Sequence, residues 1–102
     1  MLATAATALV LLHGAVSIGP TTPVCQAGVP CSKPAAHVAL TFTRGASVVI
    51  AKTDARGRYR VSLRAGVWQV HASAGMWIKP ATFTVPRAAT ATRNFAIDTG
   101  IR

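Results

Sequence analysis

Acidic side chains are nearly absent from this chain of 102 residues, which contains only Asp54 and Asp98. Hydrolysis of the glycosidase kind needs a pair of carboxyl groups, so the sequence lacks the groups for that chemistry. The nucleophile elbow G-x-S-x-G, the Walker loop, the dinucleotide fingerprint and the H-E-x-x-H motif are also missing. We therefore expect a protein that is not an enzyme and that needs no cofactor.

Cysteine is scarce too, since Cys25 and Cys31 are the only two. They lie within residues 19–36, a stretch whose four prolines exclude an inner strand. In an oxidising compartment two such cysteines usually form a disulfide, and we predict that bond here. A metal site that includes His37 is the alternative. We predict no metal, because the spacing C-x5-C is not that of zinc fingers and a fourth ligand is not evident.

The first twelve residues carry no charged side chain and have the length of the apolar part of an export signal. They are too few to cross ~30 Å of hydrocarbon, so we expect no transmembrane span. We interpret residues 1–11 as the remnant of such a signal and residues 12–102 as the domain, which predicts a secreted or cell-envelope protein. An extra helix or a tail of the mature chain is the alternative. Cleavage at the small-x-small site of Ala15 and Ser17 would cut a strand expected at residues 12–18.

Basic side chains are abundant: eleven Lys and Arg give a net charge of +9 and a pI near 11.6. Such a field attracts anionic partners, for example wall polymers, lipid headgroups or nucleic acid, and weakens as salt rises. The alternative is a compositional bias of the genome, because eight of the eleven are Arg and Ala is frequent.

The most informative stretch is residues 53–70, T-D-A-R-G-R-Y-R-V-S-L-R-A-G-V-W-Q-V. Apolar and polar residues alternate from 58 to 64, which is the period of a strand with one buried face. Asp54 and Gly57 predict a tight turn before this strand, because Asp accepts hydrogen bonds from the backbone ahead and Gly adopts positive φ. Gly66 marks a second reversal, after which Trp68 and Val70 begin a return strand.

This pattern, T-D-x-x-G-x-Y-x-V-x-L-x-x-G-x-W-x-V, resembles the carboxypeptidase regulatory-like domains, which belong with the transthyretin-like and Cna-B-like modules. Residues 14–16 and 36–40 resemble the first two strands of the family, and residues 95–102 resemble the ending of small secreted actinobacterial versions. Members usually carry Tyr in place of Trp68 and commonly Pro in place of Ala65. The resemblance implies a seven-stranded antiparallel β-sandwich that acts as an accessory or binding module.

The rest of the chain predicts further strands. Apolar residues alternate over 38–43, 81–85 and 95–97, whereas the run Val48-Val49-Ile50 is apolar on both faces, so its phase stays open. Residues 75–80 read as a loop. Trp77 in this loop is expected to form a lid over the open end of the sandwich, with an exposed contact residue as the alternative.

Arginines on the outward phase of residues 58–64 form the candidate site for an anionic ligand. These are Arg58, Arg60 and Arg64, with Arg56 and Lys52 beside them. Successive outward positions lie about 7 Å apart, so such a row meets phosphates or carboxylates at regular spacing. The alternative is a solvated face that keeps the protein soluble and discourages edge pairing. Aromatic residues are not interleaved, which argues against single-stranded nucleic acid, whose bases stack on exposed rings. We expect no specific nucleic-acid partner.

The three histidines, His13, His37 and His71, all fall on outward phases and would share a surface if the sheets bring them together. Hydroxyisourate hydrolases of the transthyretin-like fold use His and Arg with a C-terminal Y-R-G-S. This chain ends in D-T-G-I-R, so we do not carry that activity over, and it stays a distant alternative.

The sequence therefore predicts an exported, non-catalytic binding or structural module of the cell envelope or extracellular space. Its partner would be an anionic envelope polymer or another envelope protein. The alternative is a cationic surface protein that binds wall polymers or membranes through its arginines.

Overall fold

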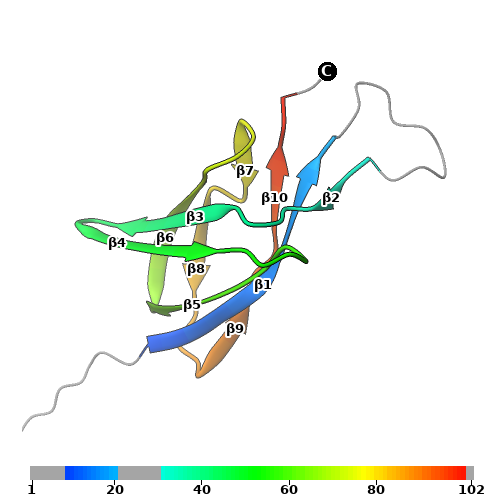
Figure 1. Ribbon diagram of the computed structural model, residues 1–102. Helices are drawn as coiled ribbons and strands as arrows, with labels where there is room; N and C mark the ends of the chain where they lie inside the picture. The colour runs from blue at the N-terminus through cyan, green and yellow to red at the C-terminus, as the bar shows by residue number, and fades with distance from the viewer. Residues whose placement is uncertain (1–8, 21–30, 101–102) are drawn as a thin grey trace, which may run out of the picture.

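The computed structural model describes residues 9–20 and 31–100, and every regular element in this part of the chain is a β-strand. Ten strands form two sheets (Figure 1), where seven strands were expected. In chain order they are β1 (Leu9–Gly19), β2 (Lys33–Pro34), β3 (Ala39–Arg44), β4 (Ser47–Lys52), β5 (Arg58–Arg64), β6 (Gly66–Ala72), β7 (Trp77–Lys79), β8 (Thr82–Val85), β9 (Thr90–Thr92) and β10 (Phe95–Asp98). The predicted all-β class is confirmed.

Strand β1 holds the larger, six-stranded sheet together, because its two halves pair with different strands. From Leu9 to Ala15 it pairs antiparallel with β5, and near its middle it pairs parallel with β9. From Val16 to Gly19 it pairs parallel with β10, with β2 antiparallel on its other side. Strand β7 completes the sheet beside β10. The two parallel pairings correct the expectation that all strands would be antiparallel.

The change of partners occurs at Gly14 and Ala15. The N–H of Ala15 donates to the side-chain oxygen of Asn94 (3.0 Å), and the N–H of Arg93 donates to the carbonyl of His13 (2.9 Å). Arg93 and Asn94 form the link between β9 and β10. A Cβ atom at position 14 would collide with the Arg93 carbonyl, so the close approach of this link requires glycine.

The smaller sheet has four antiparallel strands in the order β4-β3-β6-β8. Its register fixes the phase of the β4 run that the sequence left open. Val49 lies opposite the buried Phe42 and is half-buried, whereas Val48 and Ile50 lie on the outer face and are exposed. The inner face of β4 is therefore half-buried, and its outer face is exposed.

Side chains from both sheets form one core. Tyr59, Val61 and Leu63 of β5 are buried, as the alternation predicted, and the residues between them are exposed. Phe42 of the smaller sheet is fully buried, and its ring lies 6.0 Å from that of Tyr59 and 6.2 Å from that of Phe95 in the larger sheet. Burial of one such side chain contributes about 1.5–3 kcal/mol to stability.

Several boundaries differ from the sequence-based expectation. Strand β1 begins at Leu9 and already buries Val10, so the expected domain boundary after residue 11 falls inside a strand. The strand expected from residue 36 begins only at Ala39, because His37 adopts a left-handed conformation with φ of 57° in a turn. The expected loop of residues 75–80 contains the short strand β7.

The prediction that Trp77 forms a lid is wrong. Its side chain is 53% exposed, whereas Ile78, the next residue of β7, is buried. Neighbouring residues of a strand point to opposite faces, so the inward position of Ile78 directs Trp77 outward.

Candidate functional site

Three of the four predicted arginines lie on the outer face of β5. Arg58, Arg60 and Arg64 are exposed, and their guanidinium groups make no hydrogen bond or ion pair to another described residue. Because outward residues alternate with buried ones, Arg58 and Arg60, at positions i and i+2, are about 7 Å apart, and Arg64 follows after the outward Ser62. The row therefore presents three exposed positive charges to solvent, of which Arg58 lies within the electrostatic reach of the Asp54 carboxylate.

Arg56 lies instead in the turn that precedes β5. This turn is built by Asp54, whose carboxylate oxygen Oδ1 accepts hydrogen bonds from the backbone N–H groups of Arg56 (2.8 Å) and Arg58 (3.0 Å). Gly57 closes the turn with a φ of 76°, and its N–H donates to the Asp54 carbonyl. The turn predicted from the Asp-x-x-Gly spacing is thus present, and it sets where β5 begins.

The same hydrogen bonds keep Asp54 ionised. The backbone N–H of Arg58, then that of Arg56, lowers the pKa of this carboxyl group below its ordinary value. The carboxylate is therefore committed to the turn and is a poor general base.

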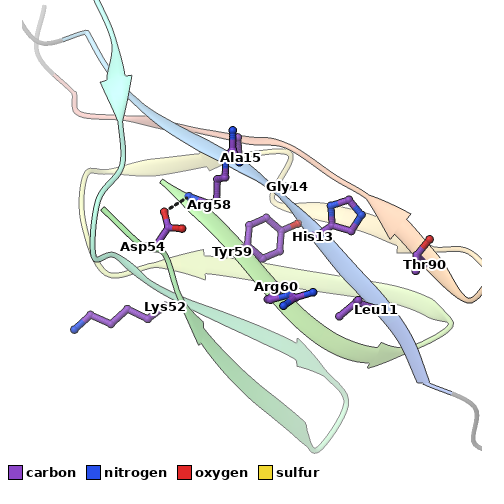
Figure 2. A pocket seen from close by; sticks show the side chains of 10 residues that line it. All are labelled: Leu11, His13, Gly14, Ala15, Lys52, Asp54, Arg58, Tyr59, Arg60 and Thr90. Atoms are coloured by element: carbon purple, nitrogen blue, oxygen red, sulfur yellow. Dashed lines mark hydrogen bonds between the residues drawn. The ribbon is translucent and has the colours of Figure 1, made fainter. Parts of the chain in front are cut away.

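Arg58 and Arg60 line an open groove of about 660 Å³ on the outer face of the β1–β5 pair, here called the arginine groove (Figure 2). Its lining also includes His13 and Leu11 from β1, and Lys52 from the end of β4. In Figure 2 the side chains of Arg60 and His13 lie near each other across two neighbouring strands. Three cationic side chains, an imidazole and the Asp54 carboxylate thus line one hollow.

The β1–β5 register explains why His13 is part of this groove. His13 lies directly opposite Arg60, and Ala15 lies opposite Arg58. On the other side of β1, the hydroxyl oxygen of Thr92 in β9 is 3.4 Å from Nε2 of His13. A row of Thr92, His13 and Arg60 therefore crosses three strands and offers both hydrogen-bonding groups and charge to an anion.

The remaining predicted residues lie outside the groove. Arg64 is at the far end of β5, opposite Leu9, and Arg56 lines a different shallow hollow with Lys33 and Ser17. Gly66, with φ of 138°, begins β6 immediately after Ala65 and serves the reversal predicted for it. The structure therefore divides the predicted arginines into a pair inside the groove and a pair outside it.

Sequence reasoning missed the contribution of His13 and Thr92. Their proximity to Arg60 depends on which strands pair and in what register, and residue 13 is far from residues 60 and 92 in the chain. The only local signal was that His13 occupies an outward position in its strand.

The three histidines do not come together. His13 is on the outer face of the larger sheet, His71 is an exposed residue of β6 in the smaller sheet, and His37 lies in a turn. Over residues 9–20 and 31–100, no three His, Cys, Asp or Glu side chains are grouped so that they would hold a metal ion. The surface shared by three histidines, which the sequence left open, is therefore not formed.

The predicted disulfide involves a residue that the structure does not describe. Cys31 is at the start of the second described range, and Cys25 lies outside the described residues. The Cys25–Cys31 bond therefore stays a prediction.

No family model, curated protein or solved structure matches this chain. The resemblance to carboxypeptidase regulatory-like domains thus stays an interpretation of the sequence pattern. Among the described residues, no helix has the length and apolar character needed to cross a bilayer.

Proposed function

We propose that this protein is a non-catalytic binding module that holds an anionic polymer in the arginine groove. The observation that carries the proposal is the convergence of Arg58, Arg60 and Lys52 on one open hollow, without an ion-pair partner among the described residues. The whole chain contains eleven basic and only two acidic residues, and one of these acids, Asp54, is committed to the turn. Asp54 also lines the groove and offsets part of this positive charge, and an external anion would neutralise the rest.

The geometry favours a polymer with repeated anionic groups over a single small anion. The outward side chains of Arg58 and Arg60 are spaced about 7 Å apart along β5, and the groove is open to solvent. Guanidinium groups pair with phosphate or carboxylate oxygens through two parallel hydrogen bonds, so each arginine can take one repeating group. The apolar side chains of Leu11 and Ala15 line the same groove and offer contact to the polymer backbone.

The non-catalytic part of the proposal follows from the groups that line the groove. Asp54 is its one carboxylate, and both its ionisation and its hydrogen bonds serve the turn. His13 is the groove's one histidine, and its imidazole has a threonine hydroxyl, not a carboxylate, beside it. In a hydrolytic site, a carboxylate or carbonyl normally accepts a hydrogen bond from the imidazole. That bond orients the imidazole and stabilises its protonated form.

We further propose that the two sheets form a β-sandwich of the carboxypeptidase regulatory-like kind and that the protein acts in the cell envelope or outside the cell. The shared core of Phe42, Tyr59 and Phe95 supports the sandwich. Since β1 begins at Leu9, any cleavage of an export signal must occur before that residue to leave the strand whole. Mass spectrometry of protein recovered from culture medium tests this, and a chain that begins after Ala15 contradicts it.

The binding proposal is tested with three double variants that each remove two positive charges. Arg58→Ser with Arg60→Ser removes both arginines of the groove. Arg56→Ser with Arg64→Ser removes the predicted arginines outside it, and Lys33→Ser with Arg87→Ser is the remote control. Binding of long-chain polyphosphate and of dextran sulfate is measured by isothermal titration calorimetry over a range of salt concentrations.

The groove variant should lose about tenfold or more in affinity, which is about 1.4 kcal/mol, and its dependence of log affinity on log salt should become shallower by about two. The remote control should change affinity about twofold, through the general field alone. Equal losses in all three variants would show that net charge, and not the groove, binds the polymer. Such a result would overturn the proposal.

A further inference from the structure

Strand β4 forms an edge of the smaller sheet and carries large apolar side chains on its outer face. Val48 is 60% exposed and Ile50 is 65% exposed, although both are β-branched residues that usually pack against a neighbour. β4 pairs with β3 on one side, and no described strand pairs with it on the other. The strand is six residues long, contains no proline and has no charged residue before Lys52.

The other sheet edges in the described part of the chain are protected. Strand β5 has arginine at three of its four outward positions, and β8 is four residues long and is followed directly by Pro86. Strands β2, β7 and β9 have three residues or fewer. Charge, proline and shortness are the usual means by which proteins prevent edges from pairing with another chain. Strand β4 has none of them along most of its length, so its edge is competent to pair.

The backbone of β4 has a defined phase toward this open edge. The N–H of Thr53, just after β4, donates to the Val38 carbonyl (2.9 Å), which continues the β3–β4 ladder. In an antiparallel pair, alternate residues point their N–H and C=O groups to opposite sides of the strand. The groups of residues 47, 49 and 51 therefore face β3, and those of Val48, Ile50 and Lys52 face away from it.

Charge decides which occupant this edge can take. Each copy has a net charge of +9, so two copies repel overall, and this repulsion is smallest when they meet on a surface with few charged side chains. Lys52 is the only Lys or Arg at the outward positions of β3, β4, β6 and β8, and it stands at the end of β4. The other outward positions are Ala39, Thr41, Thr43, Val48, Ile50, Val67, Gln69, His71, Thr82 and Thr84.

We propose that a second copy of this chain docks on β4, by antiparallel pairing of the two β4 strands about a two-fold axis at Val49. This register places Val48 opposite Ile50 of the copy, and it does so twice, because a two-fold contact is self-complementary. Both residues present their backbone groups to the edge, so each pair exchanges two hydrogen bonds. Lys52 falls opposite Ala46, so the two lysines stay apart. The four-stranded sheet becomes a continuous sheet of eight strands.

The response to salt distinguishes this contact between copies from binding of a polymer. Lys52 lines the arginine groove with Arg58, so basic groups of both copies lie near the junction. Added salt screens their repulsion and strengthens the dimer, whereas it weakens polyanion binding. A six-residue edge is a small interface, so the dimer forms at high protein concentration.

The test is sedimentation equilibrium of the full chain up to millimolar concentration, at low and high salt. We expect a monomer–dimer equilibrium whose dissociation constant falls as salt rises. Ile50→Lys should raise that constant about tenfold or more. Val67→Lys is the matched control, because Val67 is 58% exposed on the same sheet face but belongs to the inner strand β6. A monomer at all concentrations overturns the proposal, and so does an equal effect of Val67→Lys, which would indicate face-to-face stacking.

Amide hydrogen exchange of the unmutated chain gives a second readout that does not depend on any variant. The N–H groups of Val48 and Ile50 should exchange fast in dilute protein and become protected as concentration rises. The N–H of Val49, which faces β3, should be protected throughout. Protection of Val48 and Ile50 that does not depend on concentration would show that the edge is covered within one chain, and it would overturn the proposal.

Discussion

The outer faces of the two sheets have the same strand geometry and opposite chemistry. On β5 of the larger sheet, the outward positions are Arg58, Arg60, Ser62 and Arg64, whereas the outward positions of β3, β4, β6 and β8 are mostly Thr and Val. Both faces are backed by the same buried core. Because alternation in a strand constrains only the inward residues, each outer face is free to specialise. We therefore propose ligand contact on the outer face of β5 and contact between copies at the β4 edge of the smaller sheet.

The largest effect should come from a change in the core that supports both faces. Phe42→Ala removes a fully buried ring that contacts Tyr59, Phe83 and Phe95. We expect it to lower the free energy of unfolding by about 3–5 kcal/mol, since it combines lost apolar burial with a cavity. Chemical denaturation measures the change.

Thr41→Ala is the control for that experiment, because Thr41 lies on the same strand but faces outward. It should change the free energy of unfolding by about 0.5 kcal/mol or less. A similar loss in both variants would contradict the described phase of β3.

The next largest effect should come from replacing exposed arginines of β5 with apolar β-branched residues like those that β4 exposes. Arg58→Val with Arg60→Val removes the charges that protect this edge and leaves exposed β-branched residues. We expect loss of polyanion binding by about tenfold or more, together with new self-association seen by light scattering. The serine variants at the same positions remove the same charges without adding apolar surface, so they should lose binding and stay dispersed. If the valine variant also stays dispersed, charge is not what protects β5.

A smaller effect is expected at Tyr59, the one tyrosine of the chain, whose hydroxyl donates to the Arg93 carbonyl (2.6 Å). Tyr59→Phe should cost about 1 kcal/mol of stability near neutral pH. Burial raises the pKa of this hydroxyl above its ordinary value near 10.

The direction of that shift fixes the pH dependence. The neutral hydroxyl is favoured in the folded state, so its contribution is complete below pH ~10 and declines as pH rises beyond it, where the unfolded chain ionises. The difference in the free energy of unfolding between the native protein and Tyr59→Phe should therefore decrease as pH rises above ~10. Ultraviolet absorbance of the single tyrosine follows the titration, and ionisation near pH 10 in the folded protein would contradict the described burial.

The smallest effect is expected at Asp54, which is exposed at the turn. Its pKa is lowered by the backbone N–H groups of Arg58 and Arg56, so its stabilisation is complete above the unfolded value of about 3.9 and is lost as pH falls further. Asp54→Ala should lower the thermal midpoint slightly at neutral pH and reduce the loss of stability in acid. Asp54→Asn retains an oxygen acceptor, and we expect it to fall between the two at neutral pH. Unchanged acid sensitivity in Asp54→Ala would contradict the role of this carboxylate.

The part of the fold that could be predicted from the sequence is the part encoded by neighbouring residues. The alternation around Tyr59 and the spacing of Asp54 and Gly57 act within a few residues, so they give the inward face of β5 and the turn before it. The same local rule fails where both faces are apolar, as in β4, because the phase then depends on β3. The lid predicted for Trp77 is wrong because β7 has only three residues, which is too short a strand for alternation in the sequence to show that Ile78 points inward.

The candidate site was predicted in part for a similar reason. The outward arginines follow from alternation, but the groove also needs His13 of β1 and Lys52 of β4. Which strand pairs with β5 is decided by the core and by close approaches such as that of Gly14 to Arg93, which leave no periodic signal. The pairing of strands that are so far apart in the chain therefore cannot be predicted from a local sequence pattern.

The position of β1 has a consequence for when the chain can fold. The parallel partner of its second half, β10, ends at Asp98, 79 residues after Gly19 with which it pairs. While a ribosome is still adding those residues, early strands lack their neighbours, and closing such distant contacts is slow because loop entropy opposes it. We expect the second half of β1 to wait until β10 has left the ribosome, so the larger sheet is completed late in the synthesis of the domain.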